Sequence, residues 1–380
     1  MTARRLGSGR PTRNPRRPEH EMPTDPLPGM ARPSLDELLA AVVPVDEGAA
    51  EAARRRWDSL AKPPGSLGRL EEIGAVLAGI ARRPDPRPPA RAALVVCAGD
   101  HGVVASGASA WPPEVTTAMV ETICSGRAAA SALAAVAGCD VRVLDVGVDG
   151  EPAPHARLDR ERVRAGTGDI SRTVAMSRAE AASSVLAGAR AAARAAERAD
   201  VLLCGDMGIG NTTAAAGLVA GMTGADPAAV TGAGAGGGPE HVARKTELVR
   251  RAVALHRPGP DDPLGALAAV GGLEHAALTG LILGGARARL PVILDGVSTV
   301  AAALVAVALA PAAGGYLIAA HRSTEPGASV GLEALRLHPL LELEMRLGEG
   351  TGALLALPLV RAAAAALSGM AALDEVAGPR

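Results

Sequence analysis

The chain has 380 residues, of which 48% are hydrophobic, and its formal net charge is −1. This length and apolar content allow one large or two modest domains, each with a sizeable core. The charge excludes the overall basic character of a nucleic-acid-binding protein, so we expect no nucleic acid partner. The four cysteines form no CxxC pair, which argues against a zinc site and is typical of a reducing, cytoplasmic compartment.

Two segments bear on targeting and on membranes. Residues 1–33 are rich in arginine and proline and have no apolar run behind them, which predicts a disordered extension rather than a secretory signal. Residues 300–320 are apolar over about the length of a membrane span, but a proline and two glycines interrupt them. We interpret this stretch as a buried helix followed by a short strand, and we expect no membrane partner.

Short apolar runs alternate with longer helical stretches along the rest of the chain. The predicted strands are Ala93–Cys97, Val141–Val148, Val201–Cys204, Val292–Leu294 and Tyr316–Ala320. The predicted helices between them include Arg178–Arg198, His241–Leu255 and Ser298–Ala310. This alternation predicts an α/β fold with a parallel sheet and right-handed crossovers. Residues 34–89 are mostly helical in pattern and residues 354–376 are helical throughout, so we expect a small helical domain beside an α/β catalytic domain at residues 90–353.

Small polar, glycine-rich segments follow four of the predicted strands. They begin at Gly99, Gly205, Asp295 and His321. The carboxyl ends of parallel strands meet at one edge of a sheet, where α/β proteins bind their ligands. The sequence therefore predicts one composite site assembled from these segments.

Two glycine loops are candidates for binding phosphate. Gly205–Thr213 places a tight turn before a helix that starts near Thr212, and Gly232–Gly238 precedes the helix that carries Lys245. Backbone N–H groups at such turns favour an anion, and Lys245 would supply a counter-charge. A helix cap without a ligand is the alternative for the first loop. Neither loop matches a Walker A or a dinucleotide-binding motif.

Two further residues stand out by their surroundings. Glu349 lies between Gly348 and Gly350, so a ligand can approach its carboxylate closely, and partial burial would raise its pKa toward that of a general base. An ordinary surface loop is the alternative. Trp111 lies in a rigid loop before two prolines. It can stack on a planar ring or cover the edge of the core, and both interpretations remain open.

Seven motifs occur together in one order along the chain. They are KPPGSLGRLE (Lys62–Glu71), DHGV (Asp100–Val103), GDMGIGNTT (Gly205–Thr213), VGGLEHAALTG (Val270–Gly280), LDGVSTVAAAL (Leu294–Leu304), HRSTEPG (His321–Gly327) and MRLGEGTGA (Met345–Ala353). As a set they resemble the nicotinate-nucleotide:dimethylbenzimidazole phosphoribosyltransferase family, over about residues 35–376.

The resemblance implies a fold and a reaction. The expected fold is a Rossmann-like parallel sheet flanked by helices, with a small helical domain built from both terminal segments, in a homodimer. The expected reaction displaces nicotinate from nicotinate mononucleotide with 5,6-dimethylbenzimidazole and gives α-ribazole 5′-phosphate, the lower-ligand precursor of cobalamin. The cationic pyridinium leaving group is already activated, so we expect no cofactor and no metal.

The resemblance also implies roles for individual residues. Glu349 corresponds to the catalytic base, and Asp206 is a second catalytic carboxylate. The residues expected to bind the base are Trp111, Met119, Met207 and Asp295. Those expected to bind the phosphoribosyl group are Gly208, Gly210, Asn211, Gly232, Gly234, Lys245, Ser323 and Gly348. Many relatives have Glu where this chain has Asp206 and Phe where it has Val297, so the chain departs from the family around the base.

Three other functions compete with this interpretation. The first is transfer from the same donor to a different azole, purine or phenolic base, which adaptable methionines permit. The second is a non-catalytic nucleotide-binding protein, for which the carboxylate of Glu349 between glycines would have no use. The third is a GTP- or NAD-dependent enzyme, which the absence of the corresponding motifs disfavours.

Overall fold

A computed structural model describes residues 34–377, so the prediction for residues 1–33 lies outside the described part. The described residues, 34–377, belong to one compact unit. Its sheet has six strands: β1 (Ala92–Gly99), β2 (Cys139–Gly147), β3 (Leu158–Arg160), β4 (Val201–Met207), β5 (Val292–Leu294) and β6 (Leu317–Ala319). Every pair is parallel, in the order β3-β2-β1-β4-β5-β6. The predicted α/β fold is confirmed, and only the short edge strand β3 was not predicted.

The strand order places a topological switch point between β1 and β4, which is where α/β proteins bind ligands. All eight residues of β1 are buried, because helices cover both faces of the sheet. Along β4, Leu202 and Cys204 pack into one core cluster while Val201 and Leu203 pack into another. Side chains alternate between the two faces of a strand, so consecutive residues at the end of β4 point in opposite directions.

The larger cluster lies against one face of the sheet. The helices on this face are α6 (Arg178–Ala196), α7 (Asn211–Thr223), α8 (Pro227–Val230), α9 (Pro239–His256), α10 (Pro263–Val270), α11 (Leu273–Arg287), α12 (Val297–Leu309) and α13 (Pro326–Ala334). α6 and α11 pack with their backbones in contact, because a Cβ at Gly188 or at Gly280 would overlap a carbonyl oxygen of the other helix. The predicted helices on this face are confirmed to within a few residues.

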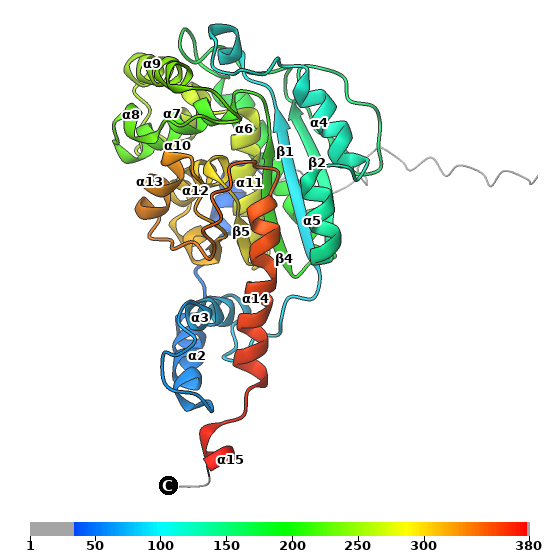
Figure 1. Ribbon diagram of the computed structural model, residues 1–380, viewed down its shortest axis with the longest axis vertical. Coiled ribbons are helices and arrows are strands. Elements are labelled where there is room, and N and C mark those ends of the chain that lie inside the picture. The colour runs from blue at the N-terminus through cyan, green and yellow to red at the C-terminus, as the bar shows by residue number, and fades with distance from the viewer. Residues whose placement is uncertain (1–33, 378–380) are drawn as a thin grey trace, which may run out of the picture. The chain divides into compact units, whose positions relative to one another are not determined.

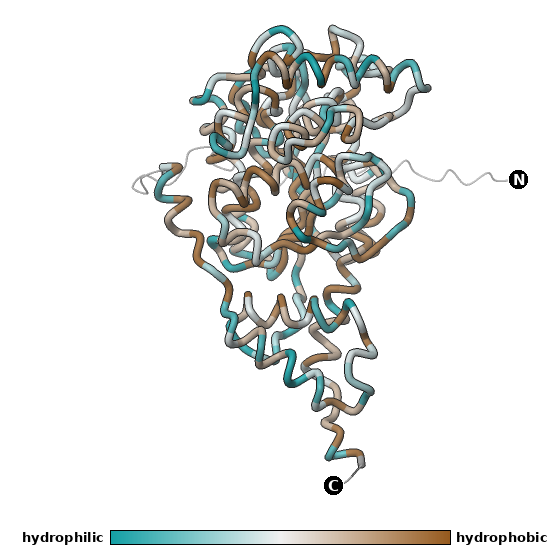
Figure 2. The backbone as a smooth tube through the Cα atoms, turned by 90° about the vertical axis from the view of Figure 1, so that its left-hand side faces the viewer, coloured by the Kyte–Doolittle hydropathy of each residue, from teal (hydrophilic) through white to brown (hydrophobic). Residues whose placement is uncertain are grey.

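The opposite face carries α4 (Val115–Cys124), α5 (Ala129–Ala137) and the upper part of α14 (Thr351–Gly369). Figure 1 shows α4 and α5 on one side of β1, with α7 to α10, α12 and α13 on the other. In Figure 2 the most hydrophobic segments lie mostly in the interior of the molecule, and hydrophilic segments lie mostly at its periphery. The sheet is therefore the centre of a core with two layers.

Three helices precede the sheet: α1 (Leu35–Ala40), α2 (Glu47–Ser59) and α3 (Arg69–Ala81). The buried indole of Trp57 packs with α3 and with Leu367 of α14. A Cβ at Gly74 would come within 2.9 Å of that ring, so only glycine leaves room for it. α14 thus contacts both the sheet and the N-terminal helices (Figure 1). A boundary between a small helical domain (34–89 with 354–376) and the α/β domain remains a prediction.

One detail of the expected helices changes. The predicted helix over residues 354–376 is wrong in its last part, because Met370 is extended and a separate short helix, α15 (Leu373–Ala377), follows. Residues 300–320 form the end of α12, a 3-10 turn (Pro311–Tyr316) and β6, as expected. Among the described helices, α14 alone is long and apolar enough to cross a membrane, and half of that stretch is buried against the rest of the protein.

Candidate active site

Two adjoining cavities open at the carboxyl ends of the strands, and they share Asn211, Thr212 and Ala235. The first cavity is lined by residues 108–111, residues 208–212, residues 233–236, His241 and Lys245. The second is lined by Asp206, Asn211, Thr212, Ala235, residues 296–298, His321, Ser323, Glu325 and residues 346–348. Three of the four segments predicted to converge line these walls, those following β4, β5 and β6, whereas the segment that begins at Gly99 lies against Gly208 and lines neither cavity.

The first glycine loop joins β4 to the N-terminus of α7, as predicted. Gly210 caps the helix with a positive φ of 96°, a conformation that favours glycine. Asn211 Nδ2 donates a hydrogen bond to Asp206 Oδ2 at 2.6 Å, and Thr212 N donates to Asn211 Oδ1 at 2.7 Å. On the side of the turn that faces α4, Ile209 N donates a hydrogen bond to the hydroxyl of Thr116 at 3.1 Å. The turn is held on both sides and presents a helix N-terminus to the cavity, the usual arrangement for an anion.

The second glycine loop lies beside the first. Lys245 is only 1% exposed, and its Nζ donates to Thr212 Oγ1 at 2.9 Å, which links α9 to α7. Burial lowers the pKa of Lys245, while the Glu325 carboxylate opposes that change. Glu325 Oε1 also accepts the amide of Gly234 at 2.7 Å, and Arg346 Nη1 donates to the Gly234 carbonyl at 2.6 Å. A phosphate here would meet the buried ammonium of Lys245 and the N-terminus of α7.

Asp206 lies in the second cavity and is 5% exposed. Burial first, and then the nearby Asp295 carboxylate, raise the pKa of Asp206 to about 7. Hydrogen bonds from Ser298 and Asn211 act in the opposite direction. Near neutral pH this side chain is therefore divided between a neutral acid and an anion.

Glu349 sits in a turn of three consecutive left-handed residues. Its φ is 61°, between Gly348 at 86° and Gly350 at 81°. Such a conformation is strained for a residue with a side chain, and strain of this kind concentrates at functional sites. The carboxylate is 3% exposed, and its Oε2 accepts the amide of Ala130 at the start of α5 at 3.3 Å. Burial raises the pKa of Glu349, although the Ala130 hydrogen bond opposes the change.

The sheet itself holds this turn in place. Glu349 N donates to the Asp206 carbonyl at 3.1 Å. A Cβ at Gly205 would lie 2.8 Å from the Glu349 carbonyl carbon, so β4 needs glycine there for the turn to approach. Asp295 accepts the amides of Gly350 at 3.1 Å and Gly352 at 2.7 Å. Its carboxylate thus caps α14, and the contribution to base binding expected for Asp295 stays a prediction.

The two predicted catalytic carboxylates point away from each other across the end of β4. Asp206 faces the side of α7 and α12, with the cavities. Met207 follows it and packs, with Met119 of α4, into the cluster on the opposite face. The Glu349 carboxylate lies on that same face, beside α5. The structure therefore places Glu349 with two of the predicted base-binding residues, and neither cavity includes it.

The remaining predicted residues divide as follows. Those that line the cavities are Gly208, Gly210, Asn211, Gly234, Lys245, Ser323 and Gly348. Gly232 lines neither, because it is buried against the Glu325 carboxylate. Trp111 is 51% exposed, and its Nε1 lies 3.5 Å from the Ala235 carbonyl. It therefore lies beside the predicted phosphate loops rather than with Met119 and Met207.

Sequence reasoning missed two charged residues of the site, Glu325 and Arg346. Both occur in the quoted motifs, HRSTEPG and MRLGEGTGA, but neither pattern shows that they bind the loop around Gly234, about a hundred residues away. The described residues also contain one trio of side chains that could hold a metal ion, His101, Glu274 and His275. This trio was not predicted from the sequence, because only CxxC pairs were considered as a signal for a metal site.

Comparison with known proteins agrees with this geometry. A family described as phosphoribosyltransferase matches residues 42–377. The nicotinate-nucleotide–dimethylbenzimidazole phosphoribosyltransferase of Salinispora tropica is 49% identical over 356 residues, covering 90% of this chain and 98% of that protein. The protein of the same name from Mycobacterium avium is 50% identical over 338 residues, covering 89% and 97%. The crystal structure of this enzyme from Thermus thermophilus superimposes with a TM-score of 0.83 at 48% identity, covering 88% of this chain and 99% of that one.

The sheet order and the paired glycine loops, together with these matches, define a phosphoribosyltransferase. The chain belongs to the nicotinate-nucleotide–dimethylbenzimidazole phosphoribosyltransferase family.

Proposed function

We propose that the chain transfers the phosphoribosyl group of nicotinate mononucleotide to 5,6-dimethylbenzimidazole, giving α-ribazole 5′-phosphate and nicotinate. The observation that carries this proposal is the arrangement around the end of β4. A cavity with two glycine loops and the buried ammonium of Lys245 lies on one side, and a strained, buried Glu349 lies on the other. The first side fits a phosphorylated sugar, and the second fits a base that must lose a proton.

In the proposed mechanism the loop amides and Lys245 hold the phosphate, and the ribose lies across the end of β4. One ring nitrogen of the benzimidazole attacks C1′ while the C1′–N bond to nicotinate breaks, and the bonding electron pair neutralises the pyridinium. Glu349 accepts the proton from the other ring nitrogen. Its raised pKa brings the carboxylate closer to the working pH, where a general base is most effective.

Asp206 has a supporting role on the donor side. The transition state of such a displacement carries positive charge on the sugar ring, as in glycoside chemistry. An ionised Asp206 in the second cavity stabilises that charge, and Asn211 fixes the carboxylate in place. Asp206 is therefore most useful above its pKa of about 7.

The base pocket is the part most open to variation. Met119 and Met207, on the same face of the sheet as Glu349, are flexible liners. Transfer to another azole, purine or phenolic base from the same donor remains the second candidate, and these residues are the observation that favours it.

Assembly and location complete the proposal. We infer a homodimer from the family resemblance, and light scattering of the purified protein checks it. We also infer a cytoplasmic enzyme without nucleic acid, membrane, metal or cofactor as partner. The four cysteines are unpaired, as expected in a reducing compartment. Cell fractionation tests the location.

The decisive experiment is a chromatographic assay with nicotinate mononucleotide and 5,6-dimethylbenzimidazole, with and without EDTA. We expect nicotinate and a benzimidazole ribotide to appear in equal amounts, at a rate that EDTA does not change. Turnover only with a different base would favour the second candidate. Absence of nicotinate release with every base offered would refute phosphoribosyl transfer, and loss of activity in EDTA would refute the metal-independent mechanism.

A further inference from the structure

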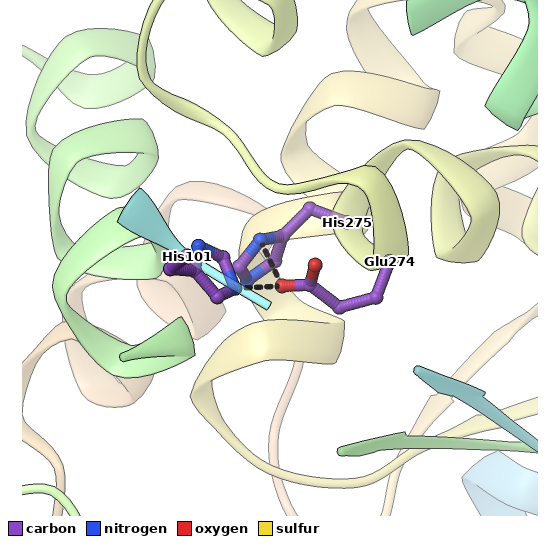
Figure 3. Close-up of side chains that lie close together, drawn as sticks. All are labelled: His101, Glu274 and His275. Carbon is purple, nitrogen blue, oxygen red and sulfur yellow. Dashed lines mark hydrogen bonds and ion pairs between the residues drawn. The ribbon is translucent and has the colours of Figure 1, made fainter. Parts of the chain in front are cut away.

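A fully buried trio of ionisable side chains lies beneath the turn of residues 208–210. His101 follows β1, and Glu274 and His275 lie in the first turn of α11. None of the three side chains is exposed. Glu274 Oε1 lies 2.8 Å from His101 Nε2 and 2.8 Å from His275 Nδ1. Figure 3 shows the carboxylate reaching both imidazole rings.

The imidazole of His101 supports the turn directly. A Cβ at Gly208 would lie 3.5 Å from His101 Nε2, and a Cβ at Gly210 would lie 3.1 Å from His101 Cβ. The backbone of the turn therefore rests on this side chain. Gly208 and Gly210 line the first cavity, whereas His101 does not. Any displacement of the ring would move the loop amides that face the ligand.

The carboxylate of Glu274 is enclosed just as tightly. A Cβ at Gly272 would overlap it, and a Cβ at Gly99 would lie 3.1 Å from its Oε2. Two histidines and a glutamate are a ligand set that zinc accepts. However, His101 Nε2 and Glu274 Oε1 already form a hydrogen bond, and backbone fills the space around the carboxylate. The geometry favours a hydrogen-bonded ion pair over a metal site.

Stability does not explain why this pair is retained. Replacing a buried ion pair by apolar side chains of similar volume is often neutral or stabilising. The charges facing His101 are Glu274 and His275 from α11, Asp100 after β1 and Asp206 from β4. Burial alone would lower the pKa of His101, but the three carboxylates outweigh it and raise that pKa. Burial would raise the pKa of Glu274, yet the two histidines hold it well below its usual range.

We propose that the His101–Glu274 pair positions the turn of residues 208–210 for the donor phosphate, through the hydrogen bond that holds the imidazole beneath the turn. This inference rests on the proposed function, in which that turn binds the phosphate of nicotinate mononucleotide. His101 is a positioning residue, because it acts through the backbone of Gly208 and Gly210. Glu274 fixes the ring, and the loop amides then meet the phosphate without rearrangement.

The test compares Glu274→Gln with His275→Gln as a matched control. The first removes the charge that holds His101, while the second removes the other partner of the same carboxylate without touching the turn. We expect Glu274→Gln to raise the KM for nicotinate mononucleotide about tenfold, the usual order for loss of a residue that orients a ligand-binding group, while kcat changes less than about threefold. His275→Gln should leave that KM within about twofold. Thermal unfolding establishes that each variant is folded, and His101→Gln replaces Glu274→Gln if the latter does not fold.

A second arm removes the phosphate from the ligand. Nicotinate riboside lacks it, so its kcat/KM should be the same in the wild-type protein and in Glu274→Gln. Inorganic phosphate should inhibit the wild-type protein more strongly than the variant. Equal losses with nucleotide and riboside, or an equal rise in KM in His275→Gln, would overturn the inference. So would one tightly bound metal ion per chain in elemental analysis. Failure of the proposed function would look different, because the wild-type protein itself would then release no nicotinate.

Discussion

The two sides of the end of β4 hold a buried carboxylate each, and they hold it in opposite ways. Asp206 lies in regular strand geometry, and its side chain is bonded by Asn211 within an open cavity. Glu349 lies in a strained turn, and its carboxylate faces only the N-terminus of α5. The carboxylate of Asp206 is thus held by side-chain hydrogen bonds, whereas that of Glu349 is placed by the backbone turn that carries it.

This difference indicates how each side should respond to change. A hydrogen-bonded carboxylate with a raised pKa affects stability and its pH dependence as much as activity. Burial raises the pKa of Glu349 as well, so its replacement also affects stability, but the loss in rate should be the larger effect. The predictions below test this contrast, in order of decreasing effect.

Glu349→Gln should lower kcat by about 100- to 10,000-fold, the usual scale for loss of a general base. Binding of nicotinate mononucleotide should be unchanged, because Glu349 lines neither cavity. Single-turnover kinetics and donor titration measure the two quantities. Glu344→Gln is the matched control, since Glu344 is also left-handed but exposed. An undiminished rate in Glu349→Gln would remove this residue from the mechanism.

Asp206→Asn should stabilise the protein at alkaline pH while slowing catalysis. The pKa of Asp206 is about 7 in the folded protein, against an ordinary value of 3.8. Between pH 3.8 and pH 7 the carboxyl group of Asp206 is ionised in the unfolded chain but protonated in the folded chain. The free energy of unfolding therefore falls as the pH rises from 3.8 to 7. Above pH 7 the group is ionised in both states, and the loss of stability stays constant. The gain in Asp206→Asn should therefore be near zero at pH 4 and about 2–4 kcal/mol at pH 8.

Denaturant unfolding at several pH values measures that gain, with Asp140→Asn on the surface as the control. A gain that did not depend on pH would show that packing, and not the carboxylate charge, sets the stability at this position.

Lys245→Met should raise the KM for nicotinate mononucleotide by about 10- to 100-fold, because a charge-assisted hydrogen bond to the phosphate is lost from a buried position. The KM for the base should not change. Arg250→Met removes a cation from the exposed side of the same helix, where it pairs with Glu247, and should have no effect. Steady-state kinetics with each substrate varied separate these outcomes. An equal rise in both KM values would place Lys245 outside the donor site.

Met119→Ala should raise the KM for the base about fivefold, since a few methylene groups of contact are lost. Met119→Leu conserves the volume and should stay close to the wild type. The KM for the donor should be unchanged in both variants. A change in the donor KM alone would move Met119 to the other side of β4, which would contradict the division described here.

Much of this fold was predictable, because local patterns specify it. Apolar runs gave five of the six strands, and the tight turn before Thr212 correctly marked the start of α7. β3 was not predicted because a strand of three residues is too short to show a hydrophobic periodicity. The end of α14 before Met370 was not predicted because apolar residues continue beyond it in the sequence.

The site was predictable where a motif carries its own chemistry. Glu349 between two glycines stood out because glycine is needed to bend the chain there. Glu325 did not stand out, because its role depends on the Gly234 amide and Lys245, which the fold alone brings near. Likewise, Asp206 and Met207 are neighbours in sequence, yet strand alternation places their side chains on opposite faces of the sheet. Contacts between distant segments were the part that one sequence could not show.

The capping of α14 by Asp295 also affects how this protein is made. The turn that carries Glu349 is anchored to β5 when the amides of Gly350 and Gly352 reach that carboxylate. Residues 348–352 are synthesised after all six strands, so this anchor has its partner in place before the turn itself is made.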